Sequence, residues 1–151
     1  MNIEIFNTYS KTYENFIPID SENVRIYVCG PTVYDFIHVG NARPLIIFDV
    51  LVRFFKFIYP KVTYVRNITD VDDKIIIQSK KNNENITDLT KRTIEAFTED
   101  AKSLHVLTPD HEPKATEHIP EMLKIIKTLI ENKNAYYSNK HVFFSVSSMS
   151  E

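Results

Sequence analysis

Glycine is scarce in this chain, which has only two among 151 residues. Average usage of about 7% would give roughly ten. Almost every turn must therefore form without glycine, and the two that remain are expected where no larger side chain fits. Both of them, Gly30 and Gly40, lie in residues 27–41 together with the only cysteine, Cys29, and with His38. This concentration makes residues 27–41 the first candidate for a functional segment.

Disulfides, membrane spans and export signals are also missing from the sequence. A single cysteine excludes an internal disulfide framework and is typical of a protein in a reducing cytosol. The most apolar stretch, residues 44–58, is interrupted by Asp49, Arg53 and Lys56, and a membrane span needs about 18 apolar residues. The N-terminus has neither the basic start nor the apolar centre of a signal peptide. These absences predict a soluble, cytoplasmic protein without membrane contact.

The overall charge gives no bulk attraction for nucleic acid. The formal net charge is −2 and the isoelectric point is near 6.2, so RNA contact must be argued from local features. With 43% hydrophobic and 25% charged residues, the composition excludes general disorder and provides for a packed core. A chain of 151 residues suits one domain or part of a larger one.

The central segments alternate between strand and helix patterns. Residues 24–30 are β-branched and aromatic and stop at a glycine, which predicts a buried strand, and residues 61–68 predict a second one. Between them, residues 41–59 predict a helix that is buried on more than one face, with Pro44 in its first turn. A strand, helix and strand over about 40 residues form a βαβ unit with parallel strands and a right-handed crossover. The sequence therefore predicts an α/β fold.

The flanking segments predict further elements. Residues 3–6 are a short strand or an extended arm. Helices are predicted over residues 72–81, over residues 87–104 with Thr87 as N-cap, and over residues 119–133, where an apolar stripe is expected to face the core. Residues 135–146 predict a closing β-hairpin that turns at Asn139 and Lys140. Because no closing helix follows, we expect a piece of a longer protein.

A ligand site is expected where the first strand ends. In open α/β sheets, ligands bind outside the carboxyl ends of parallel strands. A helix that begins near Asn41 would direct free N–H groups and a partial positive charge into this crevice. Gly40 would let a phosphate approach the backbone, and His38 could donate a hydrogen bond to the same anion. The pattern indicates a nucleotide phosphate site, although neither a P-loop nor a GxGxxG sequence is present.

Each of these residues alone has a more ordinary explanation. A lone cysteine beside a strand is most often a small buried hydrophobic residue, and a loop histidine or glycine is more often structural. The acidic group at Asp70, Asp72 and Asp73, with Lys74, suggests catalysis or metal binding, but carboxylates at a helix start usually cap the helix. Thr69, just past the second strand, is the better site candidate. The remaining histidines have no zinc spacing with Cys29; they are His105, His111, His118 and His141.

Three separated strings together resemble one protein family. They are YVCGPTVYDFIHVGNAR at residues 27–43, YVRNITDVDDKII at residues 64–76 and EPKATEHI at residues 112–119. In this order they resemble the cysteinyl-tRNA synthetases, which are class I aminoacyl-tRNA synthetases, with HVGN in the place of the HIGH motif. The resemblance spans essentially the whole chain but only the first part of a synthetase. It implies that residues 1–151 form the first part of a Rossmann-like catalytic domain, a parallel sheet with flanking helices that ends in a β-hairpin, and that the remaining catalytic and anticodon-binding regions lie outside this chain.

The resemblance also implies an activity and a set of site residues. The family activates cysteine with ATP to cysteinyl-adenylate and transfers the cysteine to tRNA(Cys) in translation. On this basis Cys29 is a zinc ligand, His38 and Asn41 are catalytic, and Gly30 and Thr69 lie near the bound amino acid. The ATP signature region would comprise Pro31, Thr32, Val33, Tyr34, Asp35, Phe36, Ile37, His38, Val39, Gly40 and Asn41. Asn41 departs from the family pattern, because it replaces the second histidine of the motif.

Zinc suits a site that must separate cysteine from serine. The two amino acids differ by one atom, so shape alone discriminates weakly, whereas zinc prefers a thiolate to a hydroxyl. The resemblance implies one Zn²⁺ per subunit, with a cysteine, a histidine and a glutamate beyond residue 151 as the other ligands. It further implies ATP as a substrate, with Mg²⁺, contact with tRNA(Cys) mainly through regions outside this chain, and a monomer. The chain alone is therefore expected to bind zinc poorly and to catalyse little or nothing.

Two alternatives stay open at this point. One is a related ATP-dependent ligase that passes cysteine to a small amino sugar, as in mycothiol synthesis, although the NITDVDDK string favours the synthetase. The other is a non-catalytic nucleotide-binding or RNA-binding module. Consumption of cysteinyl-adenylate that depends on tRNA would distinguish the first alternative. A reading frame that encodes the missing ligands would distinguish the second.

Overall fold

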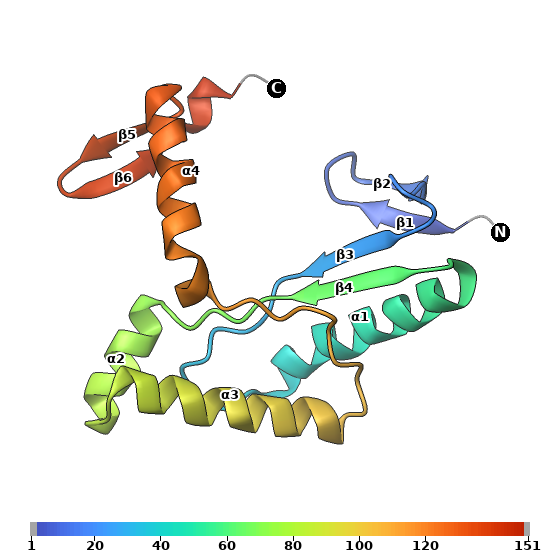
Figure 1. The fold of residues 1–151 in the computed structure, drawn as a ribbon, viewed down its shortest axis with the longest axis horizontal. Coiled ribbons are helices and arrows are strands. Elements are labelled where there is room, and N and C mark those ends of the chain that lie inside the picture. Colours follow the sequence, from blue (N-terminus) through green and yellow to red (C-terminus); the bar gives the residue numbers. More distant parts are fainter. Residues whose placement is uncertain (1–2, 150–151) are drawn as a thin grey trace.

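Two parallel strands and the helix between them form the centre of the structure, a computed structural model that describes residues 3–149 (Figure 1). Strand β3 (Val24–Val28) pairs in parallel with β4 (Val62–Arg66), in a register from Val24 opposite Val62 to Val28 opposite Arg66. Helix α1 (Val39–Ile58) makes the crossover. The predicted βαβ unit and α/β fold are confirmed, although the first strand ends at Val28 rather than at Gly30.

A small antiparallel hairpin precedes this unit. Strand β1 (Glu4–Asn7) pairs with β2 (Thr12–Asn15), and only the first of these strands was predicted. The turn contains no glycine. Instead Lys11 adopts φ 59°, its N–H donates to the Asn7 carbonyl at 2.8 Å, and the Asn7 side chain accepts from the N–H of Tyr9 at 2.9 Å. Because these bonds replace the usual turn residues, the sequence carried no clear hairpin signal.

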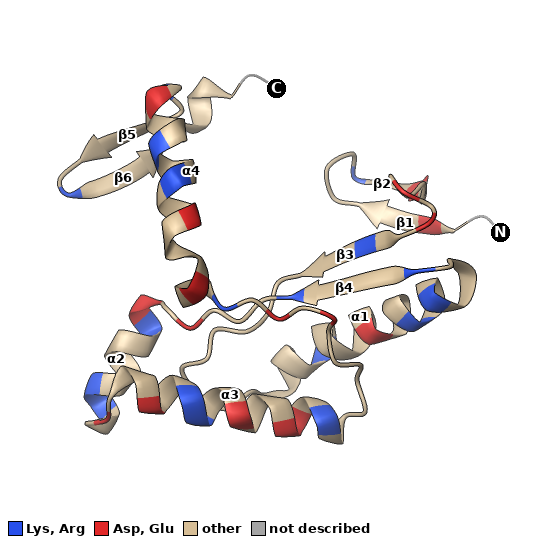
Figure 2. Ribbon diagram, viewed as in Figure 1, with Lys and Arg blue, Asp and Glu red and all other residues tan. Residues whose placement is uncertain are grey.

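Helices α2 (Asp73–Asn82) and α3 (Ile86–Ser103) follow β4, and their ends are defined by side-chain caps. Asp72 accepts from the N–H of Lys74 at 2.8 Å, so this carboxylate is the expected cap of α2. The cap of α3 is Asn85 and not Thr87, which lies inside the helix and donates its N–H to the Asn85 side chain. Asparagine caps at least as well as threonine, so the helix begins earlier. Basic and acidic residues are interspersed along α3, as the blue and red segments of its ribbon in Figure 2 show.

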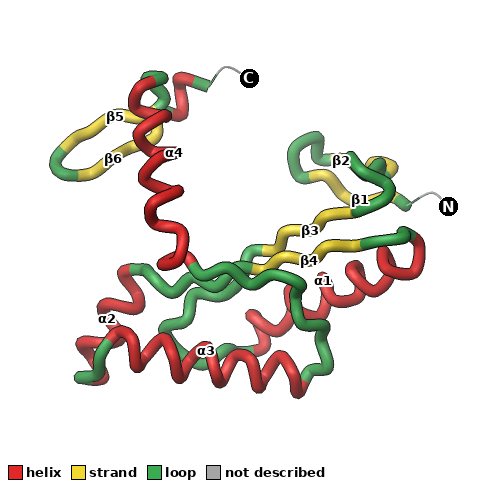
Figure 3. The backbone as a smooth tube through the Cα atoms, in the orientation of Figure 1, coloured by secondary structure: helices red, strands yellow, loops and turns green. Residues whose placement is uncertain are grey.

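An irregular extended segment lies beside β4 on the side away from β3. It is formed by residues 110–115, which pair in parallel through Val65 with His111 and Ile68 with Lys114. The N–H of Ile68 donates to the Pro113 carbonyl at 2.9 Å. This segment belongs to the loop that returns from α3 (Figure 3). Its proline and polar residues gave no strand pattern, so sequence reasoning missed it.

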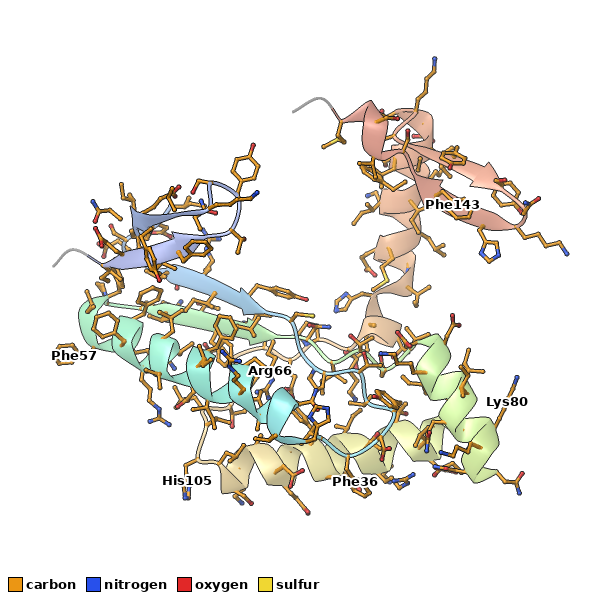
Figure 4. The ribbon with its side chains drawn as sticks, turned by 180° about the vertical axis from the view of Figure 1, so that it is seen from behind. Phe36, Phe57, Arg66, Lys80, His105 and Phe143 are labelled. Carbon is orange, nitrogen blue, oxygen red and sulfur yellow. The ribbon has the colours of Figure 1, made fainter. Side chains whose placement is uncertain are left out.

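The core lies between the sheet and one face of α1. Val52 and Phe55 of α1 are 0% and 2% exposed and pack with Val24, Val28, Val62 and Tyr64 of the strands. Burying a side chain such as Phe55 contributes about 1.5–3 kcal/mol. The other faces are open, since Phe57 is 84% exposed and points away from the body of the molecule (Figure 4). The expectation that α1 is buried on more than one face is therefore wrong for the described residues.

Arg66 is the main charged residue of this interior. Its side chain lies among the sheet and the helices in Figure 4, and the residue as a whole is only 4% exposed. It forms an ion pair with Glu112 at 2.6 Å and lies 4.9 Å from the centre of the Phe97 ring. Because a buried charge needs a partner, this pair joins β4 to the extended segment and to α3.

The C-terminal part of the described chain extends away from the sheet (Figure 1). A 3-10 turn (Ala115–His118) leads into α4 (Ile119–Glu131), and strands β5 (Ala135–Ser138) and β6 (His141–Phe144) form the predicted hairpin, followed by a short 3-10 turn (Val146–Ser148). The turn at Asn139 and Lys140 has φ values of 49° and 65°, as a type I′ turn requires.

The apolar stripe of α4 does not face a core. Within residues 3–149, α4 has no buried side chain, and Leu123 is 60% exposed. The expectation of a core-facing stripe is wrong for the described residues, where α4 packs mainly against β5 and the 3-10 turn that precedes it. In the same part of the chain, no helix combines the length and the apolar character needed to cross a membrane.

Candidate functional site

The loops that leave β3 and β4 run side by side beyond the carboxyl ends of the two strands. The N–H of Val33 donates to the Thr69 carbonyl at 3.1 Å, and the N–H of Thr69 donates to the Pro31 carbonyl at 3.0 Å. These bonds continue the parallel pairing past the sheet, as a bridge between Thr32 and Thr69. Thr69, predicted from its place after a strand, therefore lies against the start of the predicted ATP signature region.

Gly30 lies just past the end of β3, against the backbone of Asn67 just past the end of β4. A Cβ atom at this position would be 1.6 Å from the carbonyl oxygen of Asn67, so only glycine fits. The N–H of Gly30 donates to Oδ1 of Asn67 at 2.8 Å, and Nδ2 of Asn67 donates to Oγ1 of Thr69 at 3.2 Å. The sequence analysis missed Asn67, because the strand predicted over residues 61–68 included it, whereas β4 ends at Arg66.

A small cavity of about 100 Å³ lies between this strand end and the start of α1. It is lined by Val28, Cys29, Gly30, Pro31, Gly40, Asn41, Pro44, Leu45 and Phe97. The structure thus brings together five residues that were singled out from the sequence. Pro44, Leu45 and Phe97 add an apolar wall that was not predicted as part of the site.

Cys29 is exposed, and its thiol lies 3.7 Å from the Gly30 carbonyl oxygen. It is therefore not the small buried hydrophobic residue that a lone cysteine beside a strand most often is. Within residues 3–149, no group of three or more histidine, cysteine, aspartate or glutamate side chains is placed to hold a metal ion. Cys29 offers one soft sulfur donor of the kind that zinc prefers, but the described residues do not complete a zinc site.

The start of α1 is closed by a capping box. His38 is the N-cap; its Nδ1 accepts from the N–H of Gly40 at 3.0 Å, and Oδ1 of Asn41 accepts from the N–H of His38 at 3.1 Å. An imidazole nitrogen that accepts a hydrogen bond carries no proton, so the proton of the ring lies on Nε2, where it can be donated outward. The ring of His38 is thus positioned by the N–H of Gly40, and the side chain of Asn41 by the N–H of His38.

This capping changes two expectations about the helix start. The N–H of Gly40 is engaged by His38, so it is not one of the free N–H groups that were expected at the helix start. The helix also begins at Val39 rather than near Asn41, which puts Pro44 beyond the first turn. Because proline has no N–H, the Gly40 carbonyl cannot receive a helical bond from residue 44. Gly40 and Pro44 both line the cavity at this interrupted turn.

Val33, within the predicted signature region, packs against the interior and does not line the cavity. Val33 is 2% exposed and packs with Ile68, Ile75 and Leu89, and its carbonyl accepts from the hydroxyl of Thr93 at 2.9 Å. These contacts hold the loop against α3. The region therefore divides into residues that line the cavity and residues that anchor the loop.

Two aromatic side chains of this loop lie near cations of the helices. Nζ of Lys74 is 5.6 Å from the centre of the Tyr34 ring, and Cζ of Arg92 is 5.8 Å from the centre of the Phe36 ring. Cation–π contacts of this kind are attractive but weak at exposed sites. Asp35 accepts from the N–H of Phe36 at 2.8 Å. Tyr34 and Phe36 thus add to the attachment of the loop to α2 and α3.

The acidic residues after β4 have structural partners. Asp70 accepts from the N–H and the hydroxyl of Thr116 at 2.9 Å and 2.6 Å, so it joins the β4 end to the turn before α4. Asp72 caps α2. These contacts support the structural interpretation of the acidic group over a catalytic or metal-binding one.

The groups with shifted pKa values lie away from the cavity. Burial raises the pKa of the Tyr64 hydroxyl. Hydrogen bonds from Asn7 and Ser10 lower the pKa of Glu14. The hydrogen bond between Arg92 and Glu84 lowers the pKa of the glutamate and raises that of the arginine.

Comparison with known proteins gives the same family along nearly the whole chain. The family described as tRNA synthetases class I (C) catalytic domain matches residues 15–151. A protein named cysteine–tRNA ligase from Wolbachia pipientis subsp. Culex pipiens (strain wPip) is 50% identical over 149 residues, which are 99% of this chain and 32% of the relative.

Two further relatives carry the same name. The protein from Ehrlichia ruminantium (strain Gardel) is 53% identical over 144 residues, covering 95% of this chain and 32% of the relative. The protein from Saccharophagus degradans (strain 2-40 / ATCC 43961 / DSM 17024) is 48% identical over 149 residues, covering 99% of this chain and 32% of the relative. The chain thus spans about a third of the length of these curated relatives. The family match over residues 15–151 and the identities to these relatives confirm the resemblance to the cysteinyl-tRNA synthetases. The chain belongs to the family of class I (C) tRNA synthetase catalytic domains.

Proposed function

We propose that this chain is the first part of the catalytic domain of a cysteine–tRNA ligase. The enzyme would activate cysteine with ATP to cysteinyl-adenylate, release pyrophosphate, and transfer cysteine to tRNA(Cys). The observation that carries the proposal is the meeting of Cys29, Gly30, Gly40 and Asn41 around one small cavity, in a chain about half identical to proteins of that name.

The cavity suits a small amino acid. Its volume of about 100 Å³ is well below the about 300–1,000 Å³ of pockets for drug-sized ligands. Its wall combines apolar side chains from Leu45 and Phe97 with the exposed thiol of Cys29. A cysteine side chain would thus meet an apolar surface and one soft sulfur group. Gly30 and Thr69 would lie beside the bound amino acid.

Zinc would complete this pocket only with ligands from outside the described residues. Cys29 would supply one of them, and a cysteine, a histidine and a glutamate beyond residue 151 would supply the others. The ion would bind the thiolate of the substrate far better than a serine hydroxyl. The contribution of this chain is the position of the Cys29 sulfur at the strand end.

His38 would act on the phosphates of ATP. In adenylation the substrate carboxylate attacks the α-phosphorus and pyrophosphate leaves, so catalysis rests on positioning and on stabilising charge on phosphate oxygens. The capping box holds the ring through Nδ1 and leaves the Nε2 proton as the donor. Oδ1 of Asn41 is engaged by the His38 backbone, and its amide group keeps two N–H donors. ATP with Mg²⁺ would occupy the region of residues 31–41.

The proposal extends to the whole protein. The remaining catalytic region and the anticodon-binding region would lie beyond residue 151 and make most of the contacts with tRNA(Cys). The protein would act in the cytoplasm as a monomer. Residues 1–151 alone would bind zinc weakly and would have little activity.

One experiment tests these points together. The complete product of the reading frame and a protein limited to residues 1–151 are purified, and their zinc content and cysteine-dependent ATP–pyrophosphate exchange are measured, with serine as the control substrate. We expect about one zinc and strong exchange with cysteine in the complete product alone. Stoichiometric zinc and exchange in residues 1–151 would contradict the division of the site. Consumption of cysteinyl-adenylate without tRNA(Cys), but with an amino sugar, would replace the proposed acceptor.

A further inference from the structure

Asn67 joins the two strand ends from a position outside the cavity. It is the first residue after β4, and the regular pairing with β3 ends one step earlier, at Val28 opposite Arg66. Beyond that point the N–H of Gly30 finds its acceptor in Oδ1 of Asn67 at 2.8 Å. A backbone N–H can only donate, so the oxygen of the side-chain amide must face Gly30 and its NH₂ group must face the opposite way.

The NH₂ group of Asn67 is directed at Thr69. Nδ2 donates to Oγ1 of Thr69 at 3.2 Å. A hydroxyl that accepts one hydrogen bond still has its own proton to donate. The backbone of Thr69 is already fixed by its bonds to Pro31 and Val33. Asn67 therefore decides the direction of the hydroxyl, while the backbone bonds decide its place.

The backbones of Gly30 and Asn67 are also in direct contact, as the missing space for a Cβ at Gly30 requires. Cys29 lies between Val28, the last residue of β3, and Gly30. The sulfur of Cys29 is therefore carried on a backbone segment that Asn67 holds at one end. One side chain thus controls the geometry of Gly30 and Thr69, and indirectly that of Cys29.

We propose that Asn67 is a positioning residue for the amino acid substrate. Resting on the proposed function, this inference assigns it two tasks: it holds the Cys29–Gly30 backbone at the cavity, and it turns the Thr69 hydroxyl so that its proton is donated to an acceptor atom of the bound cysteine. We expect ATP binding to depend little on the side chain of Asn67, because His38 and Asn41 are positioned by their own capping box and the backbone bonds of Thr69 to Pro31 and Val33 do not involve that side chain. A defect at Asn67 is therefore specific to cysteine.

The change Asn67→Asp tests this specificity with almost no change in shape. Aspartate keeps an acceptor for the N–H of Gly30, so the strand ends stay joined. Its second oxygen cannot donate to Thr69 and instead takes the hydroxyl proton, which is then lost to the substrate. We expect the KM for cysteine in ATP–pyrophosphate exchange to rise about 10- to 100-fold, the range for a lost hydrogen bond to a charged group. The KM for ATP and the urea midpoint should stay at the wild-type values.

Asn85→Asp is the matched control. Asn85 is exposed at the N-cap of α3, where its side chain accepts from the N–H of Thr87 at 3.1 Å, and aspartate caps a helix equally well. The variant adds the same negative charge as Asn67→Asp at a site away from the cavity. Neither KM should change. An equal rise in the KM for cysteine in both variants would show a general charge effect and overturn the inference.

A double-mutant cycle with Thr69→Val tests the route of the effect. If Asn67 acts through the hydroxyl, adding Asn67→Asp to Thr69→Val should raise the KM for cysteine by less than about twofold, because coupled residues are not additive. A full additional rise, an unchanged KM in Asn67→Asp, or equal rises for cysteine and ATP together with lower stability would each overturn the positioning role. A wild-type protein without cysteine-dependent exchange would instead overturn the proposed function itself.

Discussion

Replacing Gly30 with alanine should damage the structure far more than the same change at Gly40. The added Cβ would lie 1.6 Å from the carbonyl oxygen of Asn67 and 2.7 Å from its carbonyl carbon. Real Cβ atoms essentially never come within 3.0 Å of such an atom, so the two backbones must separate by at least the difference of 1.4 Å. That shift would break the bond from the N–H of Gly30 to Asn67, now 2.8 Å long.

The size of the effect follows from two contributions. Forcing extra atoms into a packed contact costs about 1–3 kcal/mol. Leaving a partly buried N–H without its acceptor costs about 1–3 kcal/mol more. The free energy of unfolding should therefore fall by about 2–6 kcal/mol, a large share of the about 5–15 kcal/mol of a typical domain. Because Cys29 precedes Gly30, the activity of the complete protein should fall as well.

Gly40→Ala is the internal control, because its surroundings differ in kind. A Cβ at Gly40 would meet only the ring of His38, at 2.7 Å from Cε1 and 2.9 Å from Nδ1, and a side chain can turn away. Alanine also favours the helix by up to about 1 kcal/mol over glycine. Stability should therefore stay the same or rise slightly. Exchange activity should fall, since the displaced ring no longer holds its Nε2 proton in place.

Equilibrium urea denaturation followed by circular dichroism measures the difference between the two variants. We expect a lower midpoint for Gly30→Ala alone, with an unchanged slope. A Gly30→Ala protein as stable as the wild type would refute the close contact between the strand ends. A larger loss of stability in Gly40→Ala would refute the distinction between a backbone contact and a side-chain contact.

Three further predictions concern the signature loop and its supports. Asn41→His should leave ATP–pyrophosphate exchange within about threefold, because an imidazole nitrogen can accept from the N–H of His38 as Oδ1 of Asn41 does; a large gain in rate would show that a positive charge is needed. Thr93→Val removes the hydroxyl that donates to the buried Val33 carbonyl and should lower the free energy of unfolding by about 1–3 kcal/mol. Thr93→Ser keeps the hydroxyl and should stay close to wild type. Equal losses of stability in the two variants would point to packing instead. The hydrogen bond from Arg92 lowers the pKa of Glu84 below its ordinary 4.5. The stability that this pair contributes is therefore fully present above about that pH, and it is lost as the pH falls through the lowered pKa. Glu84→Gln should lose less stability on acidification than the wild type, and identical pH profiles of the urea midpoint would count against the pair.

Local patterns predicted the elements whose signals are contained in a few neighbouring residues. The βαβ unit followed from β-branched runs on either side of an apolar helix, since periodicity and chain length determine parallel pairing. The hairpin turn at Asn139 and Lys140 was predicted correctly because the turn conformation depends on the two central residues. The N-terminal hairpin was only half predicted, because its turn depends on hydrogen bonds around Asn7 rather than on glycine.

The candidate site shows the same division. The sequence alone determined which residues deserve attention, because only two glycines and one cysteine exist and all three fall at one strand end. Tertiary structure decided what surrounds each of them: Cys29 is exposed, Gly40 donates to His38, and Asn67 joins Gly30 to Thr69. The bond between Gly30 and Asn67 joins residues 37 positions apart and depends on how two strands end against each other. No local pattern encodes such a distance, so hydrogen-bond partners and exposure were decided only when the strands paired and α1 packed across them.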